Sequence, residues 1–146
     1  PARQATRSLS LGNASVLVID NDPSALAATN ALLGKWQLRA IGAASAAEAL
    51  IVCPDPPDVL IVDYQLDDGA TGDGAYRSVT QEWGVRPPVI MLTAQAGEET
   101  QAAAVAIGAH RLLKPSSPAA LRALLAEAVS RSRVRRVQPG PISTEA

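Results

Sequence analysis

Four apolar runs of this chain each end on a side chain that can take part in phosphoryl chemistry. In chain order, residues 16–19 lead into Asp20, residues 59–62 into Asp63, residues 89–92 into Thr93, and residues 112–113 into Lys114. Continuous apolar runs are typical of strands that are buried on both faces of a parallel sheet. The functional crevice of such a sheet lies outside the carboxyl ends of its strands. The sequence therefore predicts that two carboxylates, a hydroxyl and an ammonium meet at one sheet edge, where they would suit a phosphoryl group and a divalent cation.

Helical segments alternate with these runs. Asp22-Pro23 is a good helix start, and Ser45 followed by Glu48 matches a capping box. The predicted helices cover residues 22–35, 45–53, 74–83 and 98–107, and a last helix begins at 117; a further strand covers residues 38–43. The stretch 66–74 holds three Gly and three Asp and is predicted to be a mobile loop. Five strands that alternate with five helices indicate an α/β fold, a doubly wound parallel sheet covered by helices on both faces.

Composition and charge restrict the classes of function. The chain has 146 residues, enough for one domain, and a lone Cys53, which excludes an internal disulfide. No run reaches the roughly 20 apolar residues of a membrane span, and no secretory signal is evident, so we expect a cytoplasmic protein without a membrane partner. Residues 14–130 hold seven Lys/Arg and thirteen Asp/Glu, a net charge of −6, which argues against nucleic-acid binding by this domain.

The two ends differ from this acidic centre. Residues 1–13 are predicted to be a linker from an upstream region, residues 14–131 the domain, and residues 132–146 a basic, disordered tail. The first residue is Pro rather than Met, so we expect a piece of a longer protein. The arginines from residue 131 onward suit the solvated end of a helix better than contact with an acidic partner or with nucleic acid.

Asp63 is the candidate phospho-acceptor. It ends a predicted strand and precedes a Gly-rich loop, which leaves its carboxylate open to a donor, and carboxylates can attack phosphorus. The repulsion between a carboxylate and a phosphate is cancelled by a hard divalent cation, for which Asp20 and Asp22 offer oxygen ligands. Each residue also has a plain structural interpretation, because Asp22 suits a helix cap, Thr93 a turn and Lys114 a surface charge.

The chain resembles the receiver domains of two-component response regulators. The resembling segments are VLVIDNDPSAL (16–26), PDVLIVDYQLDDGATG (57–72), PVIMLTA (88–94) and RLLKP (111–115). The resemblance implies a flavodoxin-like sheet with strand order 2-1-3-4-5. It also implies transfer of a phosphoryl group to Asp63 from a histidine kinase or a phosphotransfer domain. Within the family, the segments are most similar to receivers at the C-terminus of hybrid sensor kinases, so the parent chain is expected to include a kinase, although this domain itself is not one.

The resemblance further assigns the site residues. It implies a Mg²⁺ site formed by Asp20, Asn21, Asp63 and the main-chain carbonyl of Gln65, with Asp22 as a further ligand through water. Thr93 and Lys114 match the hydroxyl and the lysine that bind the phosphoryl group. A homodimer through the last helices is a further expectation.

Two positions depart from the family pattern. Asn21 stands where receivers usually have a second carboxylate, so one full charge is lost, and we expect about tenfold weaker Mg²⁺ binding. Arg111 stands where receivers often have an aromatic side chain that swings inward. Any conformational output would therefore pass through Thr93 and the loop that follows it.

Two other functions stay open at this point. One is a receiver-like module that binds proteins without being phosphorylated, which Asn21 and Arg111 favour. The other is a phosphohydrolase of the haloacid-dehalogenase type, because Asp20-Asn21-Asp22 fits its D-x-D opening. That enzyme would need a further acidic pair after Lys114 and would leave Asp63 without a role. The discriminating observation is which aspartate carries the phosphate.

Overall fold

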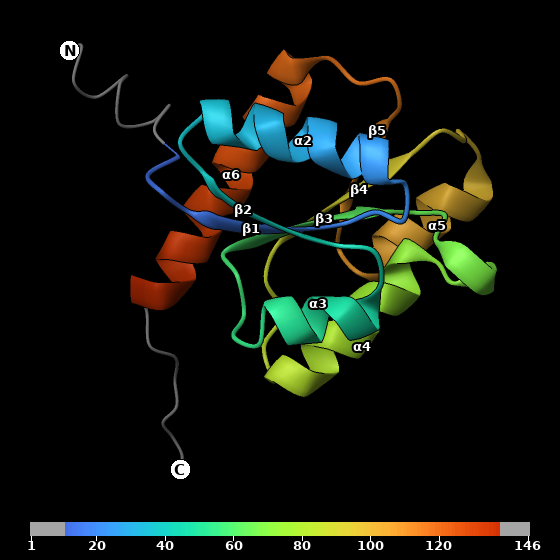
Figure 1. Cartoon of the computed structure of the whole chain (residues 1–146), viewed down its shortest axis with the longest axis horizontal. Helices are drawn as coiled ribbons and strands as arrows, with labels where there is room; N and C mark the ends of the chain where they lie inside the picture. Colours follow the sequence, from blue (N-terminus) through green and yellow to red (C-terminus); the bar gives the residue numbers. More distant parts are fainter. Residues whose placement is uncertain (1–10, 138–146) are drawn as a thin grey trace.

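Five short strands form one parallel sheet in the computed structural model, which describes residues 11–137 (Figure 1). The strands are β1 (Ser15–Ile19), β2 (Arg39–Ala43), β3 (Val59–Asp63), β4 (Val89–Thr93) and β5 (His110–Leu113). Their order in the sheet is β2-β1-β3-β4-β5, so the predicted order 2-1-3-4-5 is confirmed. Because all four pairs of neighbouring strands are parallel, all five carboxyl ends lie at the same edge of the sheet.

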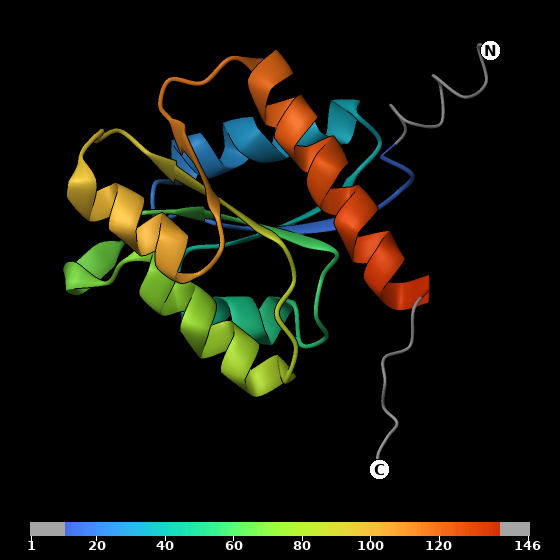
Figure 2. The same cartoon turned by 180° about the vertical axis from the view of Figure 1, so that it is seen from behind.

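Helices cover both faces of the sheet. They are α2 (Pro23–Lys35), α3 (Ala46–Val52), α4 (Gly72–Trp83), α5 (Glu98–Ala106) and α6 (Pro118–Val137). α2 and α6 lie on one face, while α3, α4 and α5 lie on the other (Figures 1 and 2).

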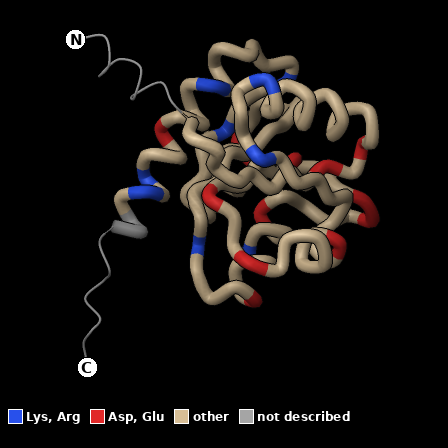
Figure 3. Tube along the Cα trace, turned by 60° about the vertical axis from the view of Figure 1, so that its left-hand side comes forward, with Lys and Arg blue, Asp and Glu red and all other residues tan. Residues whose placement is uncertain are grey.

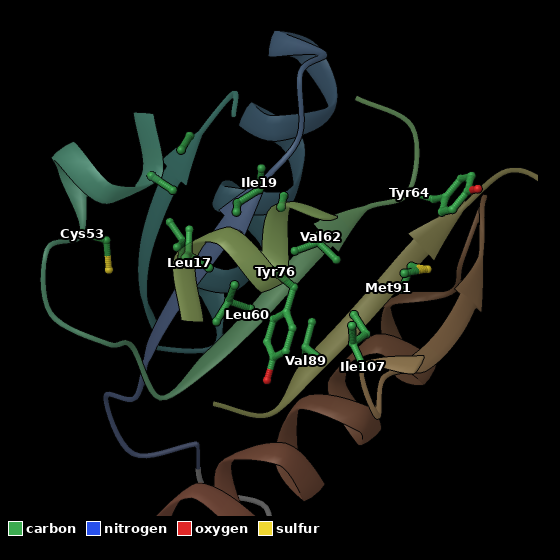
Figure 4. Packing of buried hydrophobic residues seen from close by; sticks show 14 of the residues in the cluster. Leu17, Ile19, Cys53, Leu60, Val62, Tyr64, Tyr76, Val89, Met91 and Ile107 are labelled. Carbon is green, nitrogen blue, oxygen red and sulfur yellow. The ribbon is translucent and has the colours of Figure 1, made fainter. Parts of the chain in front are cut away.

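The core is divided by the sheet into two aliphatic layers. Alternate residues of β3 belong to different layers, because side chains along a strand point to opposite faces. Leu60 and Val62 pack with Tyr76 of α4 in one layer, as Figure 4 shows, and Ile61 packs with Leu125 of α6 in the other. Both faces of the central strands are therefore buried, which explains why their sequences are continuously apolar.

The helix starts follow the predicted capping residues. Asp22 caps α2, and its carboxylate accepts hydrogen bonds from Ser24 N at 3.0 Å and Ala25 N at 3.5 Å. Ser45 caps α3 by accepting from Glu48 N at 3.1 Å, and the Glu48 carboxylate accepts from Ala44 N at 2.7 Å. These caps satisfy amide groups that the first helical turn leaves without partners.

The segment predicted as a mobile loop is more ordered than expected. It contains a 3₁₀ turn, η1 (Asp67–Gly69), and Gln65 pairs with Thr71 in an isolated antiparallel bridge. α4 begins at Gly72, two residues before the predicted start. The glycine content predicted a loop up to residue 74, but Gly72 is buried and its amide donates to the Tyr64 carbonyl at 2.8 Å, which fixes an earlier helix start.

The domain extends beyond the predicted boundaries at both ends. α6 continues to Val137, past the predicted boundary at residue 131, and Ser132 is buried with its hydroxyl 3.5 Å from Asp58 Oδ1. Leu11, which was assigned to the linker, is also buried. Arg133 Nη2 donates to the carbonyls of Leu11 and Gly12 at 3.2 and 3.0 Å, and these contacts between distant parts of the chain explain the extension. Residues 1–10 and 138–146, the rest of the predicted linker and tail, lie outside the described residues.

Acidic residues gather on one side of the domain. Figure 3 shows most Asp and Glu segments on the side away from the C-terminal end of α6, where Arg131 and Arg133 lie. Among residues 11–137, no helix combines the length and apolarity that crossing a membrane requires.

Candidate functional site

The candidate site lies at the carboxyl edge of the sheet. Asp63 and Thr93 are the last residues of β3 and β4, and Asp20 and Lys114 directly follow β1 and β5. Lys114 N donates to the Thr93 carbonyl at 2.8 Å, which holds the lysine beside β4, and the Lys114–Pro115 peptide bond is cis. The fold thus brings four residues that are distant in the sequence to neighbouring strand ends.

Lys114 joins the two carboxylates of the site. Its ammonium Nζ lies 3.1 Å from Asp63 Oδ1 and 3.6 Å from Asp20 Oδ2. The Asp20 side chain is 3% exposed and the Asp63 side chain 12%, so both acids are largely shielded from water. The other Asp20 oxygen, Oδ1, accepts from Asp22 N at 3.0 Å, which fixes the carboxylate toward the edge. One cation therefore faces two largely buried acids at the sheet edge.

This arrangement favours further positive charge at Asp63. Burial raises the pKa of Asp63, and the Asp20 charge raises it further, whereas Lys114 lowers it only in part. Burial lowers the pKa of Lys114, but its hydrogen bonds to Asp63 and Asp20 and their charges outweigh that effect, so its pKa lies above the ordinary value. Lys114 therefore stays protonated, while an ionised Asp63 lacks full compensation.

We expect Asp63→Asn to raise the free energy of unfolding at neutral pH. The pKa of Asp63 is higher in the folded than in the unfolded chain, so ionisation of Asp63 costs the folded state free energy. That cost is complete above the folded pKa and absent below the unfolded pKa of about 3.9, so the stability gain should disappear in acid. Urea unfolding at neutral pH and in acid measures the change in the free energy of unfolding, and Asp55→Asn, at an exposed position, is the control. A variant that is no more stable than the parent at neutral pH would contradict the expectation.

The remaining predicted ligands lie around this centre. Asn21 is half-buried, and its Nδ2 donates to Asp67 Oδ1 at 2.7 Å. Asp22 is exposed and caps α2, as its plain structural interpretation expected, and its bridging of a cation through water stays a prediction. Gln65 is exposed and lies two residues after Asp63, where the bridge to Thr71 fixes its backbone.

The donor atoms suit a hard divalent cation. Carboxylate, amide and main-chain carbonyl oxygens are the ligands that Mg²⁺ prefers, and it usually keeps several waters. Within residues 11–137, no three His, Cys, Asp or Glu side chains group as a metal site by themselves. A cation held by Asp20 and Asp63 would therefore also need the oxygens of Asn21 or Gln65, together with water.

Thr93 is buried, and its hydroxyl contacts the next loop rather than a carboxylate. Thr93 Oγ1 accepts from Gln95 N at 3.0 Å and lies 3.4 Å from Gln95 O. Among the described contacts, the structure therefore brings the side chains of Asp20, Asp63 and Lys114 together directly, while Thr93 joins them through its backbone carbonyl, which accepts from Lys114 N.

Three residues that shape the site had no sequence prediction. A Cβ atom on Gly72 would lie 2.6 Å from the Asp63 carbonyl oxygen, so only glycine fits beside Asp63 without movement. Tyr64 donates to Glu99 Oε2 at 3.0 Å, and Thr100 donates to Gln95 O at 2.9 Å. The glycine in the loop was the one available signal, since the other contacts join segments that the sequence separates by more than four residues.

Comparison with known proteins shows which family this chain resembles. The family model described as response regulator receiver domain matches residues 16–126. A search of curated proteins finds no significant match. A putative response regulator from Chloroflexus aurantiacus is 28% identical, with a TM-score of 0.71 over 82% of this chain and 100% of that one.

Two further solved structures are similar. A response regulator receiver domain protein from Clostridium thermocellum is 25% identical, with a TM-score of 0.72 over 83% of this chain and 98% of that one. A CheY-like receiver domain protein from Methanospirillum hungatei, 23% identical, has the same fold with a TM-score of 0.73 over 85% of this chain and 99% of that one. The family match spans most of the chain and includes all four strand ends of the site, so the chain belongs to the response regulator receiver domain family.

Proposed function

We propose that Asp63 accepts a phosphoryl group from the phosphohistidine of a histidine kinase or a phosphotransfer domain. The observation that carries this proposal is the position of the Asp63 carboxylate at the sheet edge, 3.1 Å from the Lys114 ammonium and partly open to solvent. Attachment to a hybrid sensor kinase and pairing of two copies through the last helices both stay predictions.

The proposed chemistry uses the carboxylate of Asp63, the ammonium of Lys114 and the hydroxyl of Thr93. A carboxylate oxygen of Asp63 attacks phosphorus and forms a new P–O bond, while the P–N bond to the donor imidazole breaks. The electron pair of that bond returns to the imidazole nitrogen, which takes up a proton when it leaves. Lys114 contributes a fixed positive charge toward the phosphoryl oxygens, and Thr93 a hydroxyl that can donate to one of them.

Mg²⁺ would be held by Asp20, Asp63, the Gln65 carbonyl and Asn21, with Asp22 acting through water. When bound, it supplies the positive charge that reduces repulsion between the acceptor carboxylate and the incoming phosphate. The raised pKa of Asp63 supports this assignment, because Lys114 alone leaves the ionised carboxylate undercompensated.

Intact mass spectrometry after incubation with acetyl phosphate tests the proposal. We expect one phosphoryl adduct that requires Mg²⁺, maps to Asp63 and is absent from Asp63→Asn. Asp55→Asn, an exposed acid outside the site, should load like the parent. An adduct on Asp20 instead would favour the phosphohydrolase, in which the first aspartate is the nucleophile.

A phosphorylation-independent binding module is the second candidate. It is favoured by Arg111, whose guanidinium contacts α5 and its preceding loop rather than offering the aromatic switch of many receivers. Absence of any adduct from the folded protein at high Mg²⁺ would select this candidate over the phospho-acceptor.

We expect Asn21→Asp to bind Mg²⁺ about tenfold more tightly, because it restores a full negative charge beside Asp20 and Asp63. Without Mg²⁺ the same variant should be less stable, since the hydrogen bond from Asn21 to Asp67 is replaced by a pair of like charges. Titration calorimetry with Mg²⁺ measures the affinity. Gln101→Glu adds the same charge on the exposed surface of α5 and is the control. Equal Mg²⁺ affinity of Asn21→Asp and the parent would show that the Asn21 amide does not weaken Mg²⁺ binding.

A further inference from the structure

The Gln95 carbonyl lies within reach of two threonine hydroxyls. Its oxygen is 2.9 Å from Thr100 Oγ1 and 3.4 Å from Thr93 Oγ1, and both threonines are at least 98% buried. A hydroxyl has one hydrogen to donate, and good O–H···O bonds are shorter than about 3.0 Å. Thr100 is therefore the donor to Gln95, and the hydrogen of Thr93 is not committed to that carbonyl.

Arg111 fixes the direction in which Thr100 donates. Its Nη1 donates to Thr100 Oγ1 at 2.8 Å and to the Gly97 carbonyl at 2.9 Å. Because the Thr100 oxygen accepts from Arg111, its own hydrogen must point to another acceptor. The Gly97 carbonyl is 3.3 Å away and already accepts from Arg111, which leaves the closer Gln95 carbonyl.

The hydroxyl oxygen of Thr93 is also held by a hydrogen bond from the loop. It accepts from Gln95 N at 3.0 Å, so one of its lone pairs is occupied and the hydroxyl cannot serve as acceptor on that side. The first turn of α5 is held a second time by Tyr64, which donates to Glu99. The loop 94–97 thus has fixed contacts to β4, β5 and α5.

The geometry points to Thr100 and Arg111 as positioning residues for phosphoryl binding. Arg111 donates to Thr100, and Thr100 donates to the Gln95 carbonyl. The hydrogen of Thr93 is then left for an oxygen of the phosphoryl group on Asp63. This inference rests on the proposed function, in which Thr93 donates to that group. It assigns Arg111 a role that phenylalanine, which has no donor, and tyrosine, which has one hydrogen for two acceptors, could not fill in the same way.

Thr100→Val tests the inference, because valine keeps the shape and removes the hydroxyl. The Gln95 carbonyl would then take the hydrogen of Thr93, and loading by acetyl phosphate should slow about tenfold, as expected for loss of a hydrogen bond to a charged group. Thr93→Val should slow loading similarly, and the double variant should be no slower than Thr93→Val alone. Thr100→Ser keeps the hydroxyl and should restore the parent rate.

Thr80→Val is the matched control. Thr80 is also buried, and its hydroxyl donates to the Tyr76 carbonyl at 2.8 Å within α4. Its substitution removes the same kind of bond and should leave loading unchanged. If the parent loads, equal rates for Thr100→Val and Thr80→Val, or additive effects of Thr93→Val and Thr100→Val, would overturn the inference.

A second measurement needs no phosphoryl donor. In NMR spectra of the free protein, the Thr93 methyl and Gln95 amide resonances should shift in Thr100→Val and Arg111→Gln but not in Thr80→Val. Unshifted resonances would overturn the inference even if the parent takes no phosphoryl group. Failure of loading with shifted resonances would instead count against the proposed function and keep the positioning of Thr93.

Discussion

Gly72→Ala is expected to destabilise the domain and to impair phosphoryl loading at Asp63. The added Cβ would lie 2.6 Å from the Asp63 carbonyl oxygen and 3.1 Å from Val62 Cγ2. Backbone on one side and a core side chain on the other leave little room to relax, and such overpacking typically costs about 1–3 kcal/mol. Any movement that relieves the contact shifts β3 at the acceptor residue, so stability and loading should fall together. Urea unfolding and the acetyl phosphate assay measure the two effects.

Gly74→Ala is the matched control for this prediction. It lies two residues further along the same helix, and its added Cβ would meet Thr71 Oγ1 at an ordinary 3.5 Å. Replacing a glycine within a helix by alanine stabilises it by roughly 0.5–1 kcal/mol. We therefore expect the two substitutions to have opposite effects on stability. Parent-like loading by Gly72→Ala would show that the close approach of α4 does not position Asp63.

The fold was predictable because its signals are local. The apolar runs give the strands, and caps such as Asp22 and Ser45 give the helix starts. The strand order came from the family resemblance, since no local pattern states which strands are neighbours. The acidic, hydroxyl and amino groups of the site were predictable for the same reason as the strands, because each directly follows one of them.

The contacts that orient the site were not predictable, because they join distant segments. Nothing near Asn21 in the sequence indicates its bond to Asp67, and nothing near Thr93 indicates that Arg111 holds Thr100. The extension of the domain was missed for a similar reason. The sequence after residue 131 is basic and polar, but the buried Ser132 faces Asp58 across the domain, and Arg133 holds the Leu11 carbonyl.

Lys114→Gln is expected to slow Mg²⁺-dependent loading of Asp63 by a factor on the order of 10²–10³, the usual effect of losing one aligned electrostatic group. Lys114 Nζ is 3.1 Å from Asp63 Oδ1, so in the proposed reaction its charge would act on the phosphoryl group without first having to move. Glutamine keeps a hydrogen-bond donor, on a side chain one bond shorter, but removes the charge. The rate of adduct formation, followed by intact mass, measures the loss.

Lys35→Gln is the control, because Lys35 is the other lysine of the chain and is exposed at the end of α2. The two variants should also differ in stability at neutral pH. Without Lys114, Asp20 and Asp63 face each other with no cation between them, so the pKa of Asp63 should rise further and unfolding should become easier. Added Mg²⁺ should recover part of this stability, since the proposed site would bind it in the folded and not in the unfolded chain. If both lysine variants load at the same rate, then Lys114 neutralises the two acids without contributing to phosphoryl transfer.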